Sequence, residues 1–293
     1  MKIAMIYDTN TPFTTGVYFH RAFQELGMWV DAFHHDNVKD IPEGYSIYFV
    51  CDSGPTYQIP KWKSGFSIYY GIDVHLDFDH RLEMAKSADI AAMAQMSCGA
   101  QRAINLGTPI FWMPLACDPW IHQDYQSPRE LDIAFVGHLY EDDVWRTSLR
   151  TKLLEYGYDE NKFYVGNATK EDMAKIYSRA KIVLNGTVRN NKQDINMRVF
   201  EAMSSGAYLL TQKLDNEDMD KILDSSLYST YTTEQEMFEK IDMILKDWTK
   251  YSDIAEQAKL FVRTYHTYKI HLQALMQTLS NPKKQEILSG ETS

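Results

Sequence analysis

The sequence predicts an α/β protein with two doubly wound domains, each built around a mostly parallel sheet. Short apolar segments alternate with amphipathic segments of helix length along nearly the whole chain, which is the pattern of repeated strand–helix–strand units. The chain has 293 residues, more than one typical domain but enough for two of about 120 to 150 residues. The alternation breaks once, at a proline-bracketed segment near the middle.

The first domain is expected over residues 1–115. Its predicted strands lie near 2–7, 29–33, 46–51, 66–70, 89–93 and 109–112. Its predicted helices lie near 15–26, 79–87 and 96–105. The stretch from 34 to 65 is rich in proline and glycine, so we expect loops around a single strand there.

The segment Trp112-Met-Pro-Leu-Ala-Cys-Asp-Pro-Trp-Ile-His122 interrupts the pattern with two prolines around an aspartate. Polar residues follow as far as Arg129. Proline-rich and polar segments commonly connect domains, so residues 116–130 are predicted to be a linker.

The second domain is expected over residues 131–250. Its predicted strands lie near 131–136, 162–165, 181–185, 207–211 and 227–230. Its predicted helices lie near 144–156, 170–179, 196–204, 216–223 and 232–246. One long helix, from about 254 to 279 within residues 251–280, is expected to cross back onto the first domain, and residues 281–293 form a polar tail.

Composition restricts the function to small ligands. The net charge of −10 argues against extended binding to nucleic acid or to anionic lipid, which both need clustered Lys and Arg. Three cysteines form no metal-binding spacing and no disulfide framework, so a reducing cytoplasm is expected. The apolar start of the chain is too short for a signal peptide or a membrane span and is predicted to be a buried strand.

The segment 194–211 carries the strongest signal for a ligand site. Asn196 or Asp194 can cap a helix that has Arg198 in its first turn and Glu201 about one turn further. A helix N-terminus favours anions, and an arginine there is tolerated best when an anion compensates it. Glu201 is then placed to reach hydroxyls of the same ligand. The segment therefore suggests a sugar nucleotide.

Residues that directly follow strands are further candidates, because ligands of open α/β sheets bind beyond the carboxyl ends of the strands. In the second domain the donor candidates of this kind are Gly137, His138, Gly166, Asn167 and Asn185, and Arg146 at the start of the next helix is a further donor candidate. Glycine lets a ligand approach the backbone, histidine can bond a phosphate or hydroxyl, and arginine can meet a diphosphate bidentately. Tight turns and a solvated surface arginine are equally compatible with these residues.

In the first domain, Asp8, Gly16 and His20 follow the first strand and are candidates for acceptor binding. The loop lacks the glycine patterns of dinucleotide-binding and P-loop proteins. Asp73 and His75 follow the strand that ends near residue 70, where they can act as a general base and its partner, or simply cap the structure.

A histidine pair at His34-His35, followed by Asp36, raises the question of a metal site. No further ligand at helical spacing supports one. We therefore expect surface histidines, and no metal.

Several motifs together resemble the glycosyltransferases of the GT-B architecture, which has two facing Rossmann-like domains, and within it the spore-maturation CgeB-like branch related to family four. The matching segments are KSADI at 86–90, MPLACDPWIH at 113–122, DIAFVGH at 132–138, YVGNATKEDMAKIYSRAKIVLN at 164–185, NMRVFEAMSSGAYLLT at 196–211 and HTYKIH at 266–271. The resemblance thus covers nearly the whole chain.

The resemblance implies that Glu201 holds the donor ribose, while Arg198 and the helix N-terminus face the diphosphate. Many relatives have another glutamate eight residues before the ribose-binding one. Here Gln193 stands at that position, and Asn196 or Asp194 can substitute for it.

The resemblance further implies transfer without a metal ion or cofactor, with retention of anomeric configuration. An inverting enzyme would instead need a base near the acceptor, for which Asp73 or His75 is the candidate.

The expected function is therefore a cytoplasmic glycosyltransferase that moves a hexose from a nucleotide diphosphate sugar, UDP-sugar favoured, to an acceptor that the sequence does not name. Three alternatives stay open. One is a catalytically silent nucleotide-sugar scaffold or sensor, and one is a sugar-nucleotide epimerase. The third is a phage-type enzyme that glycosylates modified DNA bases, which the acidic charge disfavours.

Overall fold

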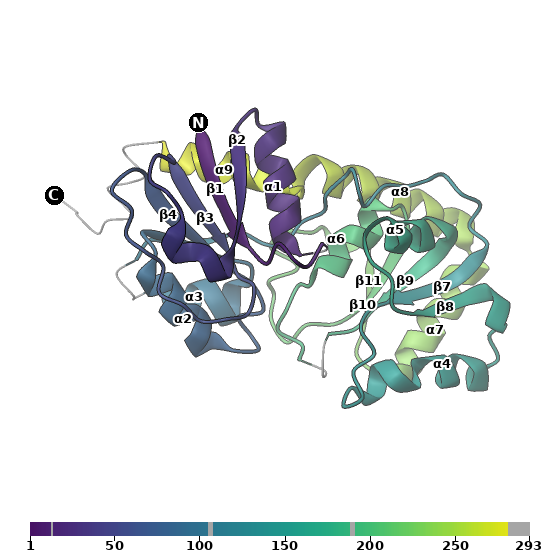
Figure 1. Cartoon of the computed structure of the whole chain (residues 1–293). Helices are drawn as coiled ribbons and strands as arrows, with labels where there is room; N and C mark the ends of the chain where they lie inside the picture. The colour runs from purple at the N-terminus through teal and green to yellow at the C-terminus, as the bar shows by residue number, and fades with distance from the viewer. Residues whose placement is uncertain (13, 105–107, 188–190, 281–293) are drawn as a thin grey trace. The chain divides into compact units, whose positions relative to one another are not determined.

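The computed structural model describes residues 1–12, 14–104, 108–187 and 191–280. The chain forms two compact units (Figure 1). Unit 1 contains Met1–Pro114 together with the chain from Tyr268 onward, and unit 2 contains Leu115–Thr267. The two parallel-sheet α/β domains predicted from the sequence are confirmed, as is the return of the C-terminal helix to the first of them.

Unit 1 is built on a parallel sheet with the strand order β2-β1-β3-β4-β5-β6. The strands are β1 (Lys2–Tyr7), β2 (Trp29–His34), β3 (Ile47–Cys51), β4 (Phe66–Gly71), β5 (Ile90–Met93) and β6 (Ile110–Trp112). β1 and β3 are continuous apolar runs and are buried along almost their whole length. Such runs are typical of strands that are covered by helices on both faces.

The two faces of this sheet are covered by α1 (Thr15–Glu25) and α9 (Tyr268–Leu279) on one side and by α2 (Phe78–Ser87) on the other (Figure 1). Phe19 of α1 packs edge-on against Tyr268 of α9, with ring centroids 4.8 Å apart. The short 3-10 helix η1 (His35–Asp40) follows β2. This aromatic contact anchors the C-terminal helix to unit 1.

The helix expected over 96–105 is less regular than predicted. It starts as the π-helical turn η2 (Met96–Ala100) and continues as the short α3 (Gln101–Ala103). Gly99 lies inside this turn, and glycine is a poor residue for a helix interior. The end of the predicted helix lies outside the described residues.

Unit 2 is built on a second parallel sheet, with the order β11-β10-β9-β7-β8. The strands are β7 (Leu131–Val136), β8 (Phe163–Gly166), β9 (Ala180–Asn185), β10 (Tyr208–Gln212) and β11 (Ser229–Tyr231). The chain passes from β7 outward to β8, then crosses back to β9 on the other side of β7. The direction of winding therefore reverses between β7 and β9.

Helices cover both faces of this second sheet (Figure 1). They are α4 (Val144–Tyr156), α5 (Lys170–Arg179), α6 (Met197–Ser204), α7 (Glu234–Lys246) and α8 (Trp248–Tyr265), with the 3-10 turns η3 (Glu160–Lys162) and η5 (Ser225–Leu227). Leu149 and Leu153 of α4 share a core with Met237 and Ile241 of α7. On the opposite face α6 packs against α8 and β10.

Two predicted helices differ in the structure. Residues 216–223 form turns, because the Asn216 side chain accepts the amide of Asp218 and so competes with helical bonding. The single final helix is two helices, α8 and α9, interrupted at His266. There the His266 carbonyl accepts the amide of Cys117 at 2.9 Å, and Thr267 bridges Cys117. This pairing with the linker ends α8.

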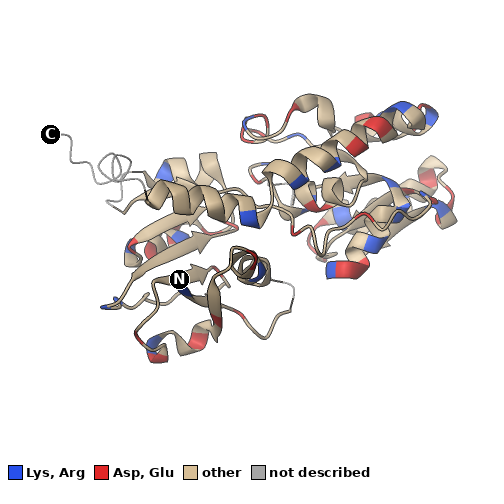
Figure 2. Cartoon of the chain, turned by 90° about the horizontal axis from the view of Figure 1, so that it is seen from above, with Lys and Arg blue, Asp and Glu red and all other residues tan. Residues whose placement is uncertain are grey.

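No helix in the described part of the chain is both long and apolar enough to span a membrane. Acidic and basic residues are mixed along the ribbons, and no helix in the view of Figure 2 is coloured as basic throughout. Acidic residues outnumber basic ones in the sequence, 40 to 30, which gives the net charge of −10.

Candidate functional site at the switch point of unit 2

The topological switch point of unit 2 lies between β7 and β9, the usual place for a ligand in an open α/β sheet. Gly137 and His138 follow β7, and Asn185 closes β9. Helix α6 begins after the second of these strands and carries Arg198 in its first turn. Four residues that are far apart in sequence therefore meet at one edge of the sheet.

Arg198 is the central side chain of this edge. Its Nε donates to the carbonyl of Val136 at 2.5 Å and its Nη1 to Oδ1 of Asn185 at 2.8 Å. The guanidinium lies 5.1 Å from the ring centroid of Phe135. The side chain remains partly exposed. Arg198 thus links the ends of β7 and β9 and still presents a charged surface.

Gly137 makes room for this arginine. A Cβ atom built on Gly137 would lie 2.6 Å from Nη2 of Arg198, so a side chain at this position would displace the guanidinium. From the sequence alone, this glycine is expected to let a ligand approach the backbone. In the structure the close neighbour is the guanidinium itself.

Arg146 occupies the interior of the same edge and is only 2 % exposed. Its Nη1 donates to the carbonyl of His138 and its Nη2 to that of Gly186, each at 3.1 Å. The alternative of a solvated surface arginine is therefore wrong. Arg146 joins the turn after β7 to the turn after β9, so that it supports the backbone around the switch point.

Asp143 is the counter-charge of Arg146, and sequence reasoning missed it. It precedes α4, where its Oδ1 accepts the amide of Arg146 at 3.2 Å, and its Oδ2 lies 3.2 Å from Nε of the same residue. An aspartate three residues before an arginine at a helix start was the available signal. Burial, and then the charge of Arg198, lower the pKa of Arg146 to about 10, against the opposing effect of Asp143.

The charges at this edge favour an anion. Arg146 and Arg198 contribute two positive charges, and Asp143 balances one of them. The N-terminus of α6 adds partial positive charge at the same place. The edge therefore has the electrostatic character of a phosphate site.

Asn196 occupies the N-cap position of α6, as predicted, but its side chain makes no capping bond. Its Nδ2 donates instead to Oδ1 of Asn185 at 3.1 Å. Asn185 is 2 % exposed and donates in turn to Oγ1 of Thr211 at 3.0 Å. Side-chain capping by Asn196 is therefore a prediction that the structure corrects, because only the side-chain nitrogen of Asn196, which cannot accept a helix N–H, makes a bond here.

Gly166 and Asn167 follow β8, the strand next to β7. The Gly166 carbonyl accepts the amide of Gly137 at 3.0 Å, and the Asn167 carbonyl accepts the hydroxyl of Tyr164 at 2.8 Å. They lie one strand away from the switch point. His138 stacks edge-on against Tyr140, with ring centroids 4.4 Å apart. Donor contacts by these residues remain predictions.

Glu201 lies on the same helix as Arg198 and is 5 % exposed. Its Oε1 faces Nε2 of the buried His122 at 3.4 Å. Burial raises the pKa of Glu201 to about 7, and the charge of Arg198 acts in the opposite direction. His122 comes from the linker, and no local pattern in the sequence connects it with Glu201.

In unit 1 the switch point lies between β1 and β3, and Asp8 and Asp52 follow these two strands. Asp8 accepts the Thr11 hydroxyl at 2.6 Å, which is the main cause of its lowered pKa. Asp52, which sequence reasoning missed, is buried and accepts Nε of Arg81 at 2.8 Å. This switch point is therefore acidic, in contrast with that of unit 2.

The other acceptor candidates lie on α1. A Cβ atom on Gly16 would lie 2.4 Å from the ring of Tyr7, so helix–strand packing accounts for this glycine. Burial lowers the pKa of His20. Acceptor binding by either residue stays a prediction.

Asp73 and His75 lie in the loop after β4, as the sequence predicted. Asp73 has a left-handed backbone with φ of 51°, a conformation that is rare outside glycine and common at functional sites. Burial raises the pKa of its carboxyl, opposed by the charges of His75 and Arg81. A carboxyl with a raised pKa suits a general base. The role of Asp73 as a general base, with His75 as its partner, stays a prediction.

Comparisons with solved structures give the same architecture. Sucrose-phosphate synthase from Thermosynechococcus elongatus matches with a TM-score of 0.66 at 12 % identity, covering 95 % of this chain and 99 % of that one. Anabaena HepE in complex with UDP and glucose matches with a TM-score of 0.66 at 12 % identity, covering 96 % and 100 %. T4 phage BGT in complex with UDP-glucose matches with a TM-score of 0.58 at 15 % identity, covering 94 % and 98 %.

These likenesses show the GT-B fold. No curated protein matches the chain. The model of the family described as glycosyl transferase-like matches residues 116–277, which is more than half of the chain and includes the whole switch-point site of unit 2. The chain therefore belongs to the glycosyl transferase-like family.

Proposed function

We propose that the chain is a glycosyltransferase that binds a nucleotide diphosphate sugar, with UDP-sugar favoured, at the switch point of unit 2. The observation that supports this most is the partly exposed Arg198, held at the sheet edge by Val136 and Asn185. It stands beside a helix N-terminus and over the buried Arg146. A diphosphate is the ligand whose charge this arrangement matches.

The proposed donor contacts divide between the two ends of the ligand. Arg198 and the N-terminus of α6 bind the diphosphate, while Glu201 accepts the ribose hydroxyls. Four of the similar solved structures, of the two proteins Anabaena HepE and T4 phage BGT, contain UDP or UDP-glucose, which supports a uridine nucleotide. Anionic Glu201 is needed for this contact, and its raised pKa therefore matters for binding.

The reaction proposed is transfer of a hexose to an unnamed acceptor, without a metal ion and with retention, as in the CgeB-like branch of family four. In such a reaction, helix dipoles and basic side chains stabilise the charge on the leaving diphosphate. Asp73, with His75 beside it, is the proposed base if the reaction inverts instead. A cytoplasmic location belongs to the same proposal.

Titration with UDP-glucose tests the donor site. Calorimetry on the intact chain should give saturable binding, and Arg198→Ala should weaken it by about ten- to a hundredfold, because a charge-assisted contact to phosphate is lost. The matched control is Arg179→Ala, since Arg179 is an exposed arginine of unit 2 that pairs with Glu130. Equal affinity of the two variants would contradict the proposed site.

One alternative is a nucleotide-sugar binder without turnover, because Gln193 stands where many relatives have glutamate. Release of UDP from UDP-glucose separates the two functions. With UDP-glucose alone, a transferase passes the glucosyl group to water and releases UDP and glucose, and Glu201→Ala should abolish this release. Tight binding without release by the unmodified chain would favour the silent binder.

A further inference from the structure

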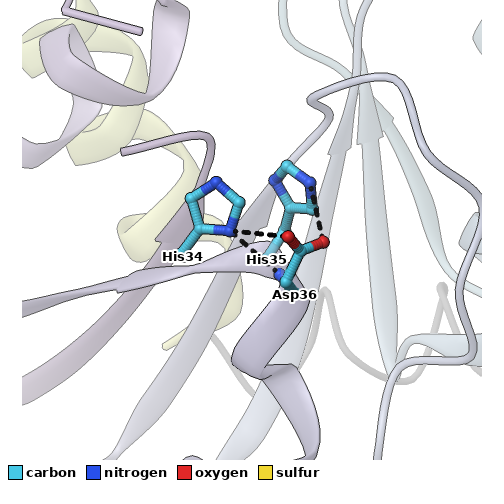
Figure 3. A group of neighbouring side chains, drawn as sticks. All are labelled: His34, His35 and Asp36. Carbon is cyan, nitrogen blue, oxygen red and sulfur yellow. Dashed lines mark hydrogen bonds and ion pairs between the residues drawn. The ribbon is translucent and has the colours of Figure 1, made fainter. Parts of the chain in front are cut away.

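The cluster His34, His35 and Asp36 lies at the end of β2 in unit 1, and none of its residues is proposed to bind the donor. The sequence predicted surface histidines here. The structure corrects this for His35, which is only 7 % exposed. Figure 3 shows how the two imidazoles and the Asp36 carboxylate come together.

One nitrogen of each ring lies near the same carboxylate. Nδ1 of His34 lies 3.4 Å from Oδ2 of Asp36, and Nε2 of His35 lies 3.3 Å from Oδ1 (Figure 3). One ligand atom from each of the three residues lies within 4.8 Å of the other two. A tetrahedral zinc ion with bonds of about 2.0 to 2.1 Å holds its ligands about 3.3 Å apart. The two nitrogen–oxygen separations, each to a different oxygen of Asp36, are close to that spacing.

The surroundings of His34 determine which of its nitrogens carries a proton. Nδ1 accepts the backbone amide of Asp36 at 3.2 Å, so in the neutral ring the proton is on Nε2. That nitrogen faces Oδ1 of Asp8 at 3.2 Å, with the side-chain amide of Asn10 3.1 Å away. A carboxylate behind the second nitrogen is the usual support of a metal-binding histidine.

His35 has a comparable support. Its Nδ1 lies 3.0 Å from Oγ of Ser53, and its ring lies parallel to that of Tyr57, at an interplanar angle of 6°. With the proton on Nδ1, Nε2 keeps its lone pair for the side of Asp36. The His35 lone pair then faces the carboxylate, and the His34 lone pair, which accepts the Asp36 amide beside it, becomes available when that bond is exchanged for a bond to a cation.

From this geometry we infer that His34, His35 and Asp36 form a site for a divalent transition-metal ion, Zn²⁺ or a close neighbour in the series. Imidazole nitrogen with one carboxylate is a ligand set that suits zinc, cobalt and nickel rather than magnesium or calcium. The Asp36 side chain is 74 % exposed, so the ion can enter from solvent and water can complete its coordination. Binding exchanges the amide bond to Nδ1 of His34 for a metal bond.

The inference is independent of the donor site, because it places the ion in unit 1 and assigns it no role in sugar transfer. It therefore stands or fails separately from the proposed function. Its test measures metal binding itself, with the intact, tag-free chain and with Co²⁺ and Zn²⁺ as the probes.

Co²⁺ should bind with one saturable equivalent and give the visible absorption of a nitrogen- and oxygen-ligated ion, and Zn²⁺ should displace it. Asp36→Asn and His35→Ala should each weaken binding by at least about tenfold. Asp79→Asn and His80→Ala are the matched controls, because they change an exposed carboxylate and a histidine of α2 outside the cluster. Both controls should bind as the unmodified chain does.

Asp36→Asn carries the test if His35→Ala misfolds, since Asp36 is exposed and asparagine preserves its shape. Absence of a saturable equivalent in the unmodified chain would overturn the site. Equal affinity of Asp36→Asn and Asp79→Asn would overturn it as well, because the ion would then be bound elsewhere.

Discussion

The Glu201 carboxyl and the His122 imidazole face each other at 3.4 Å inside unit 2. Both side chains are buried, and the helix that carries Glu201 also carries Arg198. Because burial raises the pKa of Glu201 from 4.5 to about 7, the titration of this carboxyl is expected to make both stability and ligand binding depend on pH.

Stability should fall as the pH rises from about 5 to 8. The folded chain retains the Glu201 proton up to about pH 7, whereas the unfolded chain loses it near pH 4.5. This contribution is therefore present below pH 4.5 and is lost as the pH rises through about 7, with a limit of about 3 kcal/mol. Denaturant unfolding at several pH values gives the free energy of unfolding as a function of pH. The decrease that is due to Glu201 should be missing in Glu201→Gln.

Glu155→Gln serves as the control for that measurement, because Glu155 is an exposed carboxyl on α4. It should retain the full pH dependence of the unmodified chain. If the free energy of unfolding depends on pH identically in Glu201→Gln and Glu155→Gln, the pKa of Glu201 is not raised by folding.

Affinity for UDP-glucose should rise as the pH increases from 6 to 8. The proposed ribose contact needs the ionised carboxylate, which at pH 6 is about a tenth of the population if the pKa is about 7, so binding should be about tenfold weaker there. UDP-glucose suits this test because its phosphates, unlike a terminal phosphate, do not titrate near pH 6. Calorimetry should show that the affinity of Glu201→Gln for UDP-glucose does not change with pH. If this variant keeps the pH dependence of the unmodified chain, the ribose contact is refuted.

Gly137→Ala should weaken nucleotide binding by about tenfold or more without unfolding unit 2. The new methyl group would lie 2.6 Å from Nη2 of Arg198, so the guanidinium must move away from its place at the sheet edge. A misplaced charge-assisted contact loses much of its free energy.

The control for Gly137→Ala is Gly71→Ala. Gly71 ends β4 in unit 1, and its added Cβ atom would lie 3.1 Å from the Tyr69 ring. UDP-glucose titration should show normal affinity for this control. Normal affinity of Gly137→Ala would mean that the position of Arg198 does not govern binding.

Arg146→Lys should destabilise unit 2 by about 1 to 3 kcal/mol, although it keeps the charge. A lysine cannot reproduce the planar fork that serves the carbonyls of His138 and Gly186, and a buried carbonyl without a partner is costly. Arg150→Lys on the same helix is the control, since Arg150 is 49 % exposed and pairs with Glu160 at the surface. Comparable unfolding curves for the two variants would contradict the supporting role of Arg146.

Local patterns were sufficient for the strands and most helices, because continuous apolar runs and helical periodicity are properties of neighbouring residues. They failed for residues 216–223, where the Asn216 side chain binds the backbone, and at His266, where the distant Cys117 ends a helix. Position at the end of a strand was likewise enough to select Gly137 and Asn185, since parallel strands end at one edge, and Arg198 was selected by its place in the first turn of a predicted helix.

By itself the sequence determined the two-domain α/β architecture and the helix that carries Arg198 and Glu201. Hydrophobic periodicity, glycine positions and strand ends depend only on residues that are close together in the sequence. Only the tertiary structure decided what these side chains contact. It brought His122 to Glu201, Asp143 and two carbonyls to Arg146, and Asp8 to His34. Such pairings depend on how the strands are ordered in each sheet, and strand order is set by long-range packing that no local pattern records.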